Sequence, residues 1–414
     1  MTADLGMYAR EQDEVSHGAV HASRRQRVAF VGPMPPSEYG VPVYCGETVK
    51  ALSVYYDVDV IATTQVDEGV ARYAKRVLDA TCIDRLDQYH GALFVFGNHP
   101  QHFDALRLSL SYDGGVGIFH DAQQLDFARY AIGADSVKRV IGEYISDDVD
   151  DRDLELWHRK RHRLPHPVLD PCAQAISCAI VHSPTQLEHF RKYYKTPARY
   201  IPVAIQHSFT EREISSDCRM RAKLRCGVHE RRIAVGSFGF VHDQKLSSLV
   251  VSAMRHLHDR GCNVHYYLVG DASAESSGAV VEYAKQLGVD GFLHFTGRLS
   301  EEQYLDWLLA VDVAVQLRRP MFGQLSGGLL DCVAAGVSVI TTESLAESIE
   351  ARGFTRIVKD SCSSLDVADE VYGELTSQAR PERGGTMWQR YVEQHSFAEY
   401  ARQLHELIQR QGRY

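Results

Sequence analysis

Side chains that can hold an anion gather in the stretch LRRPMFGQLSGGLLD, residues 317–331. Arg318 precedes a loop containing Gly323, and Ser326 and Gly327 stand where an apolar run with helical spacing begins. Serine favours a helix N-cap, and glycines in the first turn let a ligand approach N–H groups at the positive end of the helix dipole. Arginine adds fork-shaped donors to phosphate oxygens. The stretch therefore predicts a phosphate site, the alternative being a glycine-containing turn beside a solvated arginine pair.

Four further residues could take part in ligand binding. His120 and Asp121 follow an apolar strand, and the top of a parallel strand looks into the ligand crevice of an open α/β sheet. We expect His120 to be functional, whereas a histidine that caps the next turn is the alternative. Asp331, one turn into the helix described above, can accept from a sugar hydroxyl. Gly40 ends a proline-rich loop, where a turn or close contact with a phosphate would need a residue without Cβ.

Composition limits the class of protein. The chain has 414 residues, 44% hydrophobic and 24% charged, which suits two soluble globular domains. Its net charge of -9 argues against binding to nucleic acid. It contains no apolar run long enough to span a bilayer, and its polar first 25 residues lack the apolar core of a signal peptide. We therefore expect a cytoplasmic protein.

Metal binding and disulfides receive little support. His158, His162 and His166 have the spacing of metal ligands on a helix, but Pro165 and Pro167 would break that helix. The 9 cysteines form no CxxC pair and are typical of reduced, mostly buried side chains. No metal site is predicted.

Short apolar strands alternate with amphipathic helices in both halves of the chain, a pattern typical of parallel sheets covered on both faces. It predicts an α/β protein with two Rossmann-like, doubly wound domains that face each other across a cleft. The expected units are a flexible tail (1–25), a first domain (26–205), a linker (206–231), a second domain (232–386) and one long amphipathic helix (387–414) that crosses back to the first domain.

Five segments, in this order, carry a resemblance to a known family. They are Pro35-Pro36 with Gly40 and Tyr44, Gly97-Asn98 with His102, His120-Asp121, Leu317-Arg318 with Pro320, Gly323, Gln324, Ser326 and Gly327, and the closing helix from Trp388 to Ile408. The chain resembles a retaining glycosyltransferase of the GT-B fold, family 4 type, in the branch with an LRxPxxGExSG-like loop. The resemblance covers nearly everything from Arg27 to Ile408.

The resemblance implies transfer of a hexose or aminohexose from a nucleoside-diphosphate sugar, first of all a UDP-sugar, to a hydroxyl of a small molecule or glycan. It implies no metal or other cofactor, so positive side chains and helix N-termini must stabilise the departing diphosphate. The catalytic residues would be His120, Lys245, Arg318 and Gln324. Donor-binding residues would be Gly40, Gly239, Gly297, Arg298, Gly323, Leu325, Ser326, Gly327 and Asp331. Acceptor-binding residues would be Tyr44, Asn98, His99 and Asp121.

Two departures from the family pattern keep a second hypothesis open. Gln324 stands where the branch has a glutamate, and Phe240 stands near a missing arginine. A sugar-nucleotide-binding protein or partner subunit without catalytic activity is therefore the alternative. A nicotinamide-dependent enzyme would need a GxGxxG after the first strand, and residues 31–36 do not supply one. The acidic run from Asp147 to Glu155 could attract a cationic acceptor such as an aminocyclitol.

Overall fold

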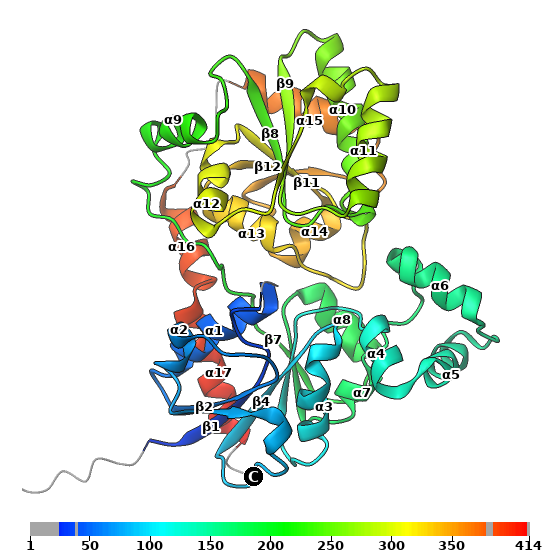
Figure 1. Ribbon diagram of the computed structural model, residues 1–414, viewed down its shortest axis with the longest axis vertical. Helices are drawn as coiled ribbons and strands as arrows, with labels where there is room; N and C mark the ends of the chain where they lie inside the picture. The colour runs from blue at the N-terminus through cyan, green and yellow to red at the C-terminus, as the bar shows by residue number, and fades with distance from the viewer. Residues whose placement is uncertain (1–24, 38–39, 378–383, 412–414) are drawn as a thin grey trace, which may run out of the picture.

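The computed structural model describes residues 25–37, 40–377 and 384–411, which form two α/β domains stacked one above the other (Figure 1). The first contains a sheet of 7 parallel strands in the order β3-β2-β1-β4-β5-β6-β7. Its strands are β1 (Arg27–Gly32), β2 (Asp57–Ala62), β3 (Arg76–Asp79), β4 (Gly91–Phe96), β5 (Val116–Phe119), β6 (Cys178–Val181) and β7 (Ala198–Tyr200). Most of these strands are buried on both faces, which is why they read as continuous apolar runs.

The second domain repeats this arrangement with 6 parallel strands in the order β10-β9-β8-β11-β12-β13. They are β8 (Ile233–Phe238), β9 (Val264–Val269), β10 (Leu293–Gly297), β11 (Val313–Gln316), β12 (Ser338–Thr342) and β13 (Thr355–Val358). In both sheets the chain order reverses at the centre, between β1 and β4 and between β8 and β11. Ligands of open α/β sheets bind at such a reversal, outside the carboxyl ends of the strands.

Helices cover both faces of each sheet. Those of the first domain are α1 (Gly40–Leu52), α2 (Glu68–Ala71), α3 (Phe103–Ser109), α4 (Leu125–Ile132), α5 (Ala134–Ile145), α6 (Asp151–Arg159), α7 (Asp170–Ala173) and α8 (Pro184–Tyr193). Those of the second are α9 (Ser216–Arg225), α10 (Ser247–Asp259), α11 (Ala274–Gln286), α12 (Glu301–Ala310), α13 (Gly327–Ala334), α14 (Glu343–Ser348) and α15 (Ser364–Thr376). The predicted doubly wound fold is confirmed.

Local signals placed some boundaries well and missed others. Ser326 caps α13 by accepting from the Leu329 N–H, and Ser300 and Gln303 form a capping box at α12. The short exposed strand β3 and the helices α5 and α15 were not predicted, although both helices have apolar residues at helical spacing. The predicted tail lies outside the described residues except for Arg25.

The prediction of one long C-terminal helix is wrong in one respect. The segment forms two helices, α16 (Thr386–Gln394) and α17 (Phe397–Gln411), with a break at His395. In α16 the Trp388 indole donates to the Val333 carbonyl of the second domain, 2.9 Å away, whereas α17 packs on α1 of the first domain (Figure 1). The Ile205 N–H donates to the His395 carbonyl at 2.7 Å, so the two connections between the domains are joined at the break.

The linker is also shorter than predicted. Its second half forms α9, which packs on the second domain, where Arg219 donates to the Leu309 and Ala335 carbonyls. Lys223 pairs with Asp312 at 2.6 Å. The helix α9 therefore belongs to the second domain.

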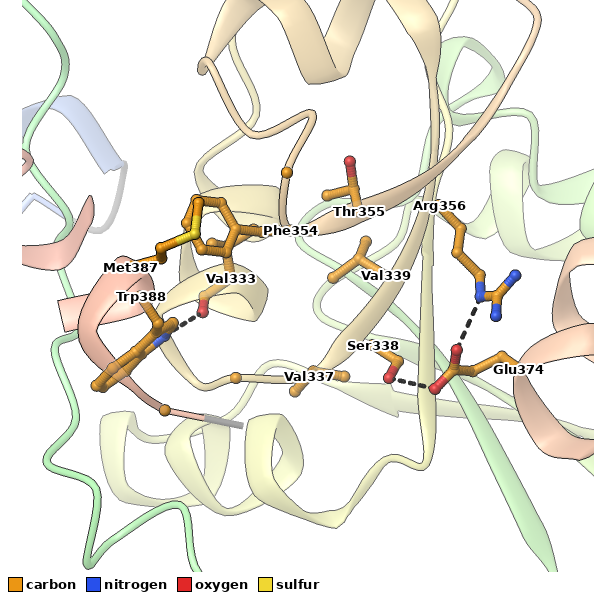
Figure 2. Close-up of a pocket in the computed structure, with 13 residues that line it drawn as sticks. Val333, Val337, Ser338, Val339, Phe354, Thr355, Arg356, Glu374, Met387 and Trp388 are labelled. Carbon is orange, nitrogen blue, oxygen red and sulfur yellow. Dashed lines mark hydrogen bonds and ion pairs between the residues drawn. The ribbon is translucent and has the colours of Figure 1, made fainter. Parts of the chain in front are cut away.

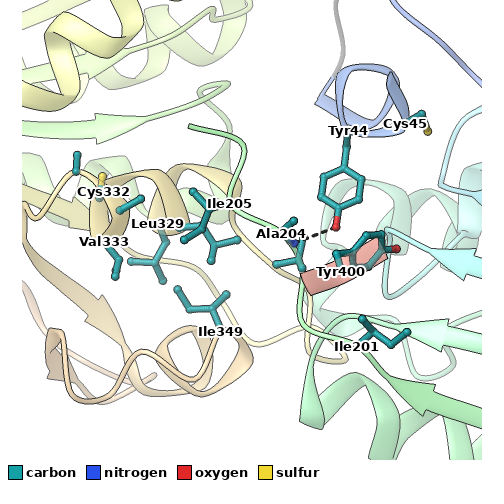
Figure 3. Close-up of a cluster of buried hydrophobic side chains, with 14 of the residues drawn as sticks. Tyr44, Cys45, Ile201, Ala204, Ile205, Leu329, Cys332, Val333, Ile349 and Tyr400 are labelled. Carbon is teal, nitrogen blue, oxygen red and sulfur yellow. Dashed lines mark hydrogen bonds between the residues drawn. The ribbon is translucent and has the colours of Figure 1, made fainter. Parts of the chain in front are cut away.

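One apolar cluster runs through both domains (Figure 3). Tyr44 of α1 packs against Tyr400 of α17, and its hydroxyl accepts from the Ala204 N–H, just before the linker, at 2.9 Å. Leu329 of α13 and Ile349 belong to the same cluster on the side of the second domain. Burial of apolar area across the interface therefore holds the domains together. Among the residues described, no helix is long and apolar enough to cross a bilayer.

Three glycines with positive φ end neighbouring strands of the second sheet: Gly239, Gly270 and Gly297. A Cβ on Gly270, whose φ is +141°, would lie 2.7 Å from the Gly239 carbonyl oxygen. This edge of the sheet therefore depends on close contact between two backbones.

We predict that Gly270→Ala lowers the free energy of unfolding by about 2 kcal/mol or more, because the substitution adds both a clash and a strained φ. Urea denaturation measures the change. The control is Gly278→Ala on the surface of α11, where a Cβ meets nothing within 4 Å and alanine favours the helix. Equal effects of the two substitutions would contradict the prediction.

Candidate donor-binding site at the domain interface

Lys245 stands at the central reversal of the second sheet, just after β8. Its ammonium donates to the Phe238 carbonyl and fits against Gly239, where a Cβ would lie 2.7 Å from Nζ. Gly239 has a φ of +91°. Burial, with Arg318 nearby, lowers the pKa of Lys245 from 10.5 to about 7. The pKa is this low because no anion compensates for the lost hydration of the ammonium.

Arg318 reaches the same place from the end of β11. Its Nη1 donates to the Leu325 carbonyl at 2.8 Å, and burial lowers its pKa although the Asp121 carboxylate acts in the opposite sense. His242 completes this group of three basic side chains, here called the basic cluster. Burial lowers the pKa of His242 to about 3, with Arg318, Lys245 and Arg161 adding to the effect, so its ring is neutral. Lys245 and Arg318 both donate to backbone carbonyls, which do not neutralise a positive charge, so an anionic ligand would be attracted to them.

The N-terminus of α13 opens beside the basic cluster. In the part of the chain that the structure describes, no acceptor pairs with the N–H groups of Gly327 and Gly328. A Cβ on Gly327 would meet nothing within 4 Å, whereas one on Gly328 would lie 2.9 Å from the Phe238 carbonyl oxygen. Gly327 therefore leaves room for a ligand, and Gly328 lets the helix pack closely on β8.

His120 lies at the end of β5 in the first domain. Its ring packs edge-on against Tyr44, with centroids 4.8 Å apart, and lies 5.0 Å from the ring of His182. Burial, with a smaller effect of His182, lowers the pKa of His120 well below its ordinary value, so the ring is neutral at neutral pH. Among the described residues no hydrogen bond engages the His120 ring, which leaves both ring nitrogens for a ligand.

Gln324 joins the two domains. Its Oε1 accepts from the Ala122 N–H at 2.9 Å, and its Nε2 donates to Asp121 Oδ1 at 3.3 Å. The preceding residue, Gly323, accepts at its carbonyl from the Ser183 hydroxyl at 2.8 Å. The loop after β11 therefore packs on the first domain, and Gly323, predicted to bind the donor, contacts protein there.

Asp331 lies beneath the N-terminus of α13 and already has protein partners. Its Oδ2 accepts from the Tyr304 hydroxyl at 2.9 Å, and its Oδ1 is 3.1 Å from His207 Nδ1 in an ion pair that is not aligned as a hydrogen bond. Burial lowers the pKa of His207, but the Asp331 carboxylate outweighs that effect and the net pKa is raised. A bond from Asp331 to a ribose stays a prediction and would require one of these partners to move.

The other predicted donor residues lie around the same edge. Gly297 ends β10 with open space beside it. Arg298 is exposed and lies 3.3 Å from Asp271, and Leu325 packs on the shared core. Gly40 begins α1 at the surface of the first domain, with nothing within 4 Å of a Cβ.

Two of the predicted acceptor residues require correction. Tyr44 is 6% exposed and belongs to the shared core, so it cannot contact an acceptor without leaving it. The Asn98 side chain accepts from the N–H groups of Asp126 and Phe127 and so caps α4. Of the other two, His99 is exposed and caps the next turn, and Asp121 is held by Gln324.

The acidic run, which the sequence suggested as an attraction for a cationic acceptor, starts a helix in the structure. Asp150 caps α6 in a capping box with Asp153, and Asp151 pairs with Lys138 at 3.0 Å. The helices α5 and α6 stand apart from the body of the first domain (Figure 1). Asp150 and Asp153 already stabilise the N-terminus of α6, and Asp151 already has a cationic partner. The hypothesis that the acidic run binds a cationic acceptor is therefore weaker.

Several residues of the site could not be identified from the sequence. His242, Arg161 and Ala122 lie in segments without a motif, and His207 lies in the predicted linker. Gly270, which also borders this edge, is the one residue here that the sequence could have indicated, because it ends a predicted strand. The others are brought together by folding.

A hollow of about 380 Å³ lies at the opposite edge of the second sheet, by the amino ends of β12 and β13 (Figure 2). Apolar side chains such as Phe354 and Met387 line one side of it. On the other side Glu374 accepts from Ser338 at 2.6 Å and from Arg356 at 2.8 Å. The hollow is away from the basic cluster, which lies at the carboxyl edge.

Comparison with known proteins supports one class for this site. Residues 231–372 match the family model described as "Glycosyl transferases group 1". This segment contains the basic cluster, the N-terminus of α13 and the glycine edge. No curated protein matches the chain at a significant level.

Solved structures of glycosyltransferases share the fold over nearly the whole chain. A glycosyltransferase from Rickettsia africae is 11% identical with a TM-score of 0.65, over 94% of this chain and 98% of that one. Sucrose-phosphate synthase from Thermosynechococcus elongatus is 13% identical with a TM-score of 0.63, over 93% and 99%. HepE of Anabaena, crystallised with UDP and glucose, is 13% identical with a TM-score of 0.59, over 93% and 99%. The chain has the GT-B fold of these proteins.

We predict that a diphosphate binds less tightly as the pH rises above about 7. A bound anion raises the pKa of Lys245, which is about 7 in the free protein. Above that pH binding must therefore take up a proton, at a cost of up to about tenfold in affinity per pH unit.

Titration calorimetry with UDP at about pH 8, in two buffers of different ionisation enthalpy, measures the proton taken up. Lys245→Met should abolish this uptake. Binding of UDP to the unaltered protein without proton uptake would contradict the prediction.

Proposed function

We propose that the protein is a retaining glycosyltransferase that transfers a hexose or aminohexose from a nucleoside-diphosphate sugar to an acceptor hydroxyl. The observation that carries the proposal is the basic cluster of Lys245, Arg318 and His242 beside the open N-terminus of α13. Such a place suits a diphosphate, because free N–H groups and cations together stabilise phosphate charge. The match of residues 231–372 to a glycosyltransferase family model supports it.

In this proposal the diphosphate lies between Lys245, Arg318 and the N–H group of Gly327. These groups stabilise the negative charge that develops on the leaving diphosphate, so the reaction needs no bound metal. The neutral His120, on the opposing domain, donates or accepts a hydrogen bond near the sugar. We propose UDP as the nucleotide, since HepE, which shares this fold, was crystallised with it.

A sugar-nucleotide-binding protein without catalytic activity is the second candidate. Gln324 and Asp331, which the resemblance assigns to the donor, are both engaged by protein partners. Release of the sugar from a UDP-sugar, to water or to an acceptor, separates the two candidates. The anomeric configuration of the product, read by NMR, tests retention.

We expect UDP to raise the thermal midpoint of the protein, because a ligand that binds only the folded state stabilises it. Lys245→Met and Arg318→Met should each weaken UDP binding by about tenfold or more, through loss of a charged hydrogen-bond donor. The matched control is Lys285→Met on the exposed surface of α11, which should bind UDP normally. Screening UDP-, GDP- and dTDP-sugars, with NAD as a negative control, identifies the nucleotide. If none of them shifts the midpoint, the proposal fails.

His120→Ala should reduce turnover of a UDP-sugar by about 100-fold while changing the Kd of UDP little, because the ring acts on the sugar and the leaving oxygen. Steady-state kinetics and calorimetry on the same variant measure the two quantities. Equal losses in binding and turnover would assign His120 to nucleotide binding.

A further inference from the structure

Gln324 makes two bonds of opposite polarity to adjacent residues of the other domain. The Ala122 N–H can only donate, so it faces the amide oxygen, and the Asp121 carboxylate accepts from the amide nitrogen. The second oxygen of Asp121 is already taken by the Asn98 N–H at 2.8 Å. Each polar group in this arrangement therefore has a partner of the opposite hydrogen-bonding polarity.

The backbone of the loop is held to the first domain at the same point. A Cβ on Gly323, whose φ is +81°, would lie 2.4 Å from the Gln186 nitrogen. Ser183, the N-cap of α8, donates to the Gly323 carbonyl. Phe322 packs edge-on against His189, with ring centroids 5.3 Å apart. The loop therefore lies in close contact with the first domain and presents Gln324 to Asp121.

We propose that Gln324, Asp121 and the Ala122 N–H form a latch that holds the two domains closed, in which the amide of residue 324 matches a hydrogen-bond donor on one side and an acceptor on the other. A glutamate has nearly the same shape but accepts only. Its second oxygen would face Asp121 Oδ1 across the 3.3 Å now bridged by the amide, and two carboxylates so close cannot both stay charged. Gln324 is therefore a positioning residue that fits this chain, and its departure from the family glutamate does not indicate lost function.

The latch links closure to the proposed site. Arg318, one of the two cations of the diphosphate site, donates to the carbonyl of Leu325, next to Gln324 in the loop. Closing the loop on the first domain therefore fixes this cation and brings His120 of that domain to the same interface. Excluding water by such closure protects a reactive donor from hydrolysis. This consequence rests on the proposed function, whereas the latch does not.

A reciprocal exchange tests the latch. Gln324→Glu places two carboxylates together. Asp121→Asn places two amide nitrogens together, because the new amide at position 121 must keep its oxygen for the Asn98 N–H. The double variant restores the pairing, since the new carboxylate at position 324 can accept from both the Ala122 N–H and the new amide. Neither substitution changes the size of a side chain appreciably.

Hydrogen exchange of the unliganded protein gives a direct measurement, because the Ala122 N–H is itself part of the latch. We expect exchange in a peptide containing Ala122 to be about tenfold faster or more in each single variant and close to that of the unaltered protein in the double variant. Exchange in β9, away from the interface, is the control and should be the same in all four proteins.

Equal exchange at Ala122 in all four proteins, or a double variant as fast as the singles, would overturn the latch. A variant that unfolds reveals itself by faster exchange in β9, and the comparison is then made with Gln324→Met, which keeps the length but neither bond. UDP binding is measured separately by calorimetry. Loss of the proposed function would show as no binding of UDP to the unaltered protein, with the exchange pattern intact.

Discussion

Two buried cations share the carboxyl edge of the second sheet, and the rest of the site depends on their incompletely compensated charge. Burial, with the charge of Arg318 added to it, brings the pKa of Lys245 down to about 7. A shift of this size corresponds to free energy on the order of 5 kcal/mol that an anion can recover. Backbone carbonyls accept hydrogen bonds from both cations and hold them in place, which makes their burial possible.

The joining of the two domains is the second constraint. Two connections pass between them, the linker and the pair α16 and α17, and both pack into one apolar cluster. The Ile205–His395 hydrogen bond ties the connections together at one point. The loop with Gln324 lies at a separate contact between the domains.

Residues at motif positions have hydrogen-bond partners in this structure that fit their own chemistry. Gln324 has partners of both polarities, and the Asp331 carboxylate, predicted to bind the donor, contacts Tyr304 and His207. In each case charge and hydrogen-bonding capacity are balanced within the chain. A substitution at a motif position can therefore be understood only together with its neighbours in space.

The sequence by itself determined the two doubly wound domains, most strand positions, the cap at Ser326 and the positions of Arg318 and His120 at strand ends. These follow from local rules, since apolar periodicity and capping act within a few residues. Only the tertiary structure decided that Tyr44 is buried, that Asn98 caps α4, that the C-terminal helix breaks at His395 and that Gln324 contacts Asp121. Those facts depend on pairs of residues far apart in the chain, and a single sequence contains no local signal of such pairing.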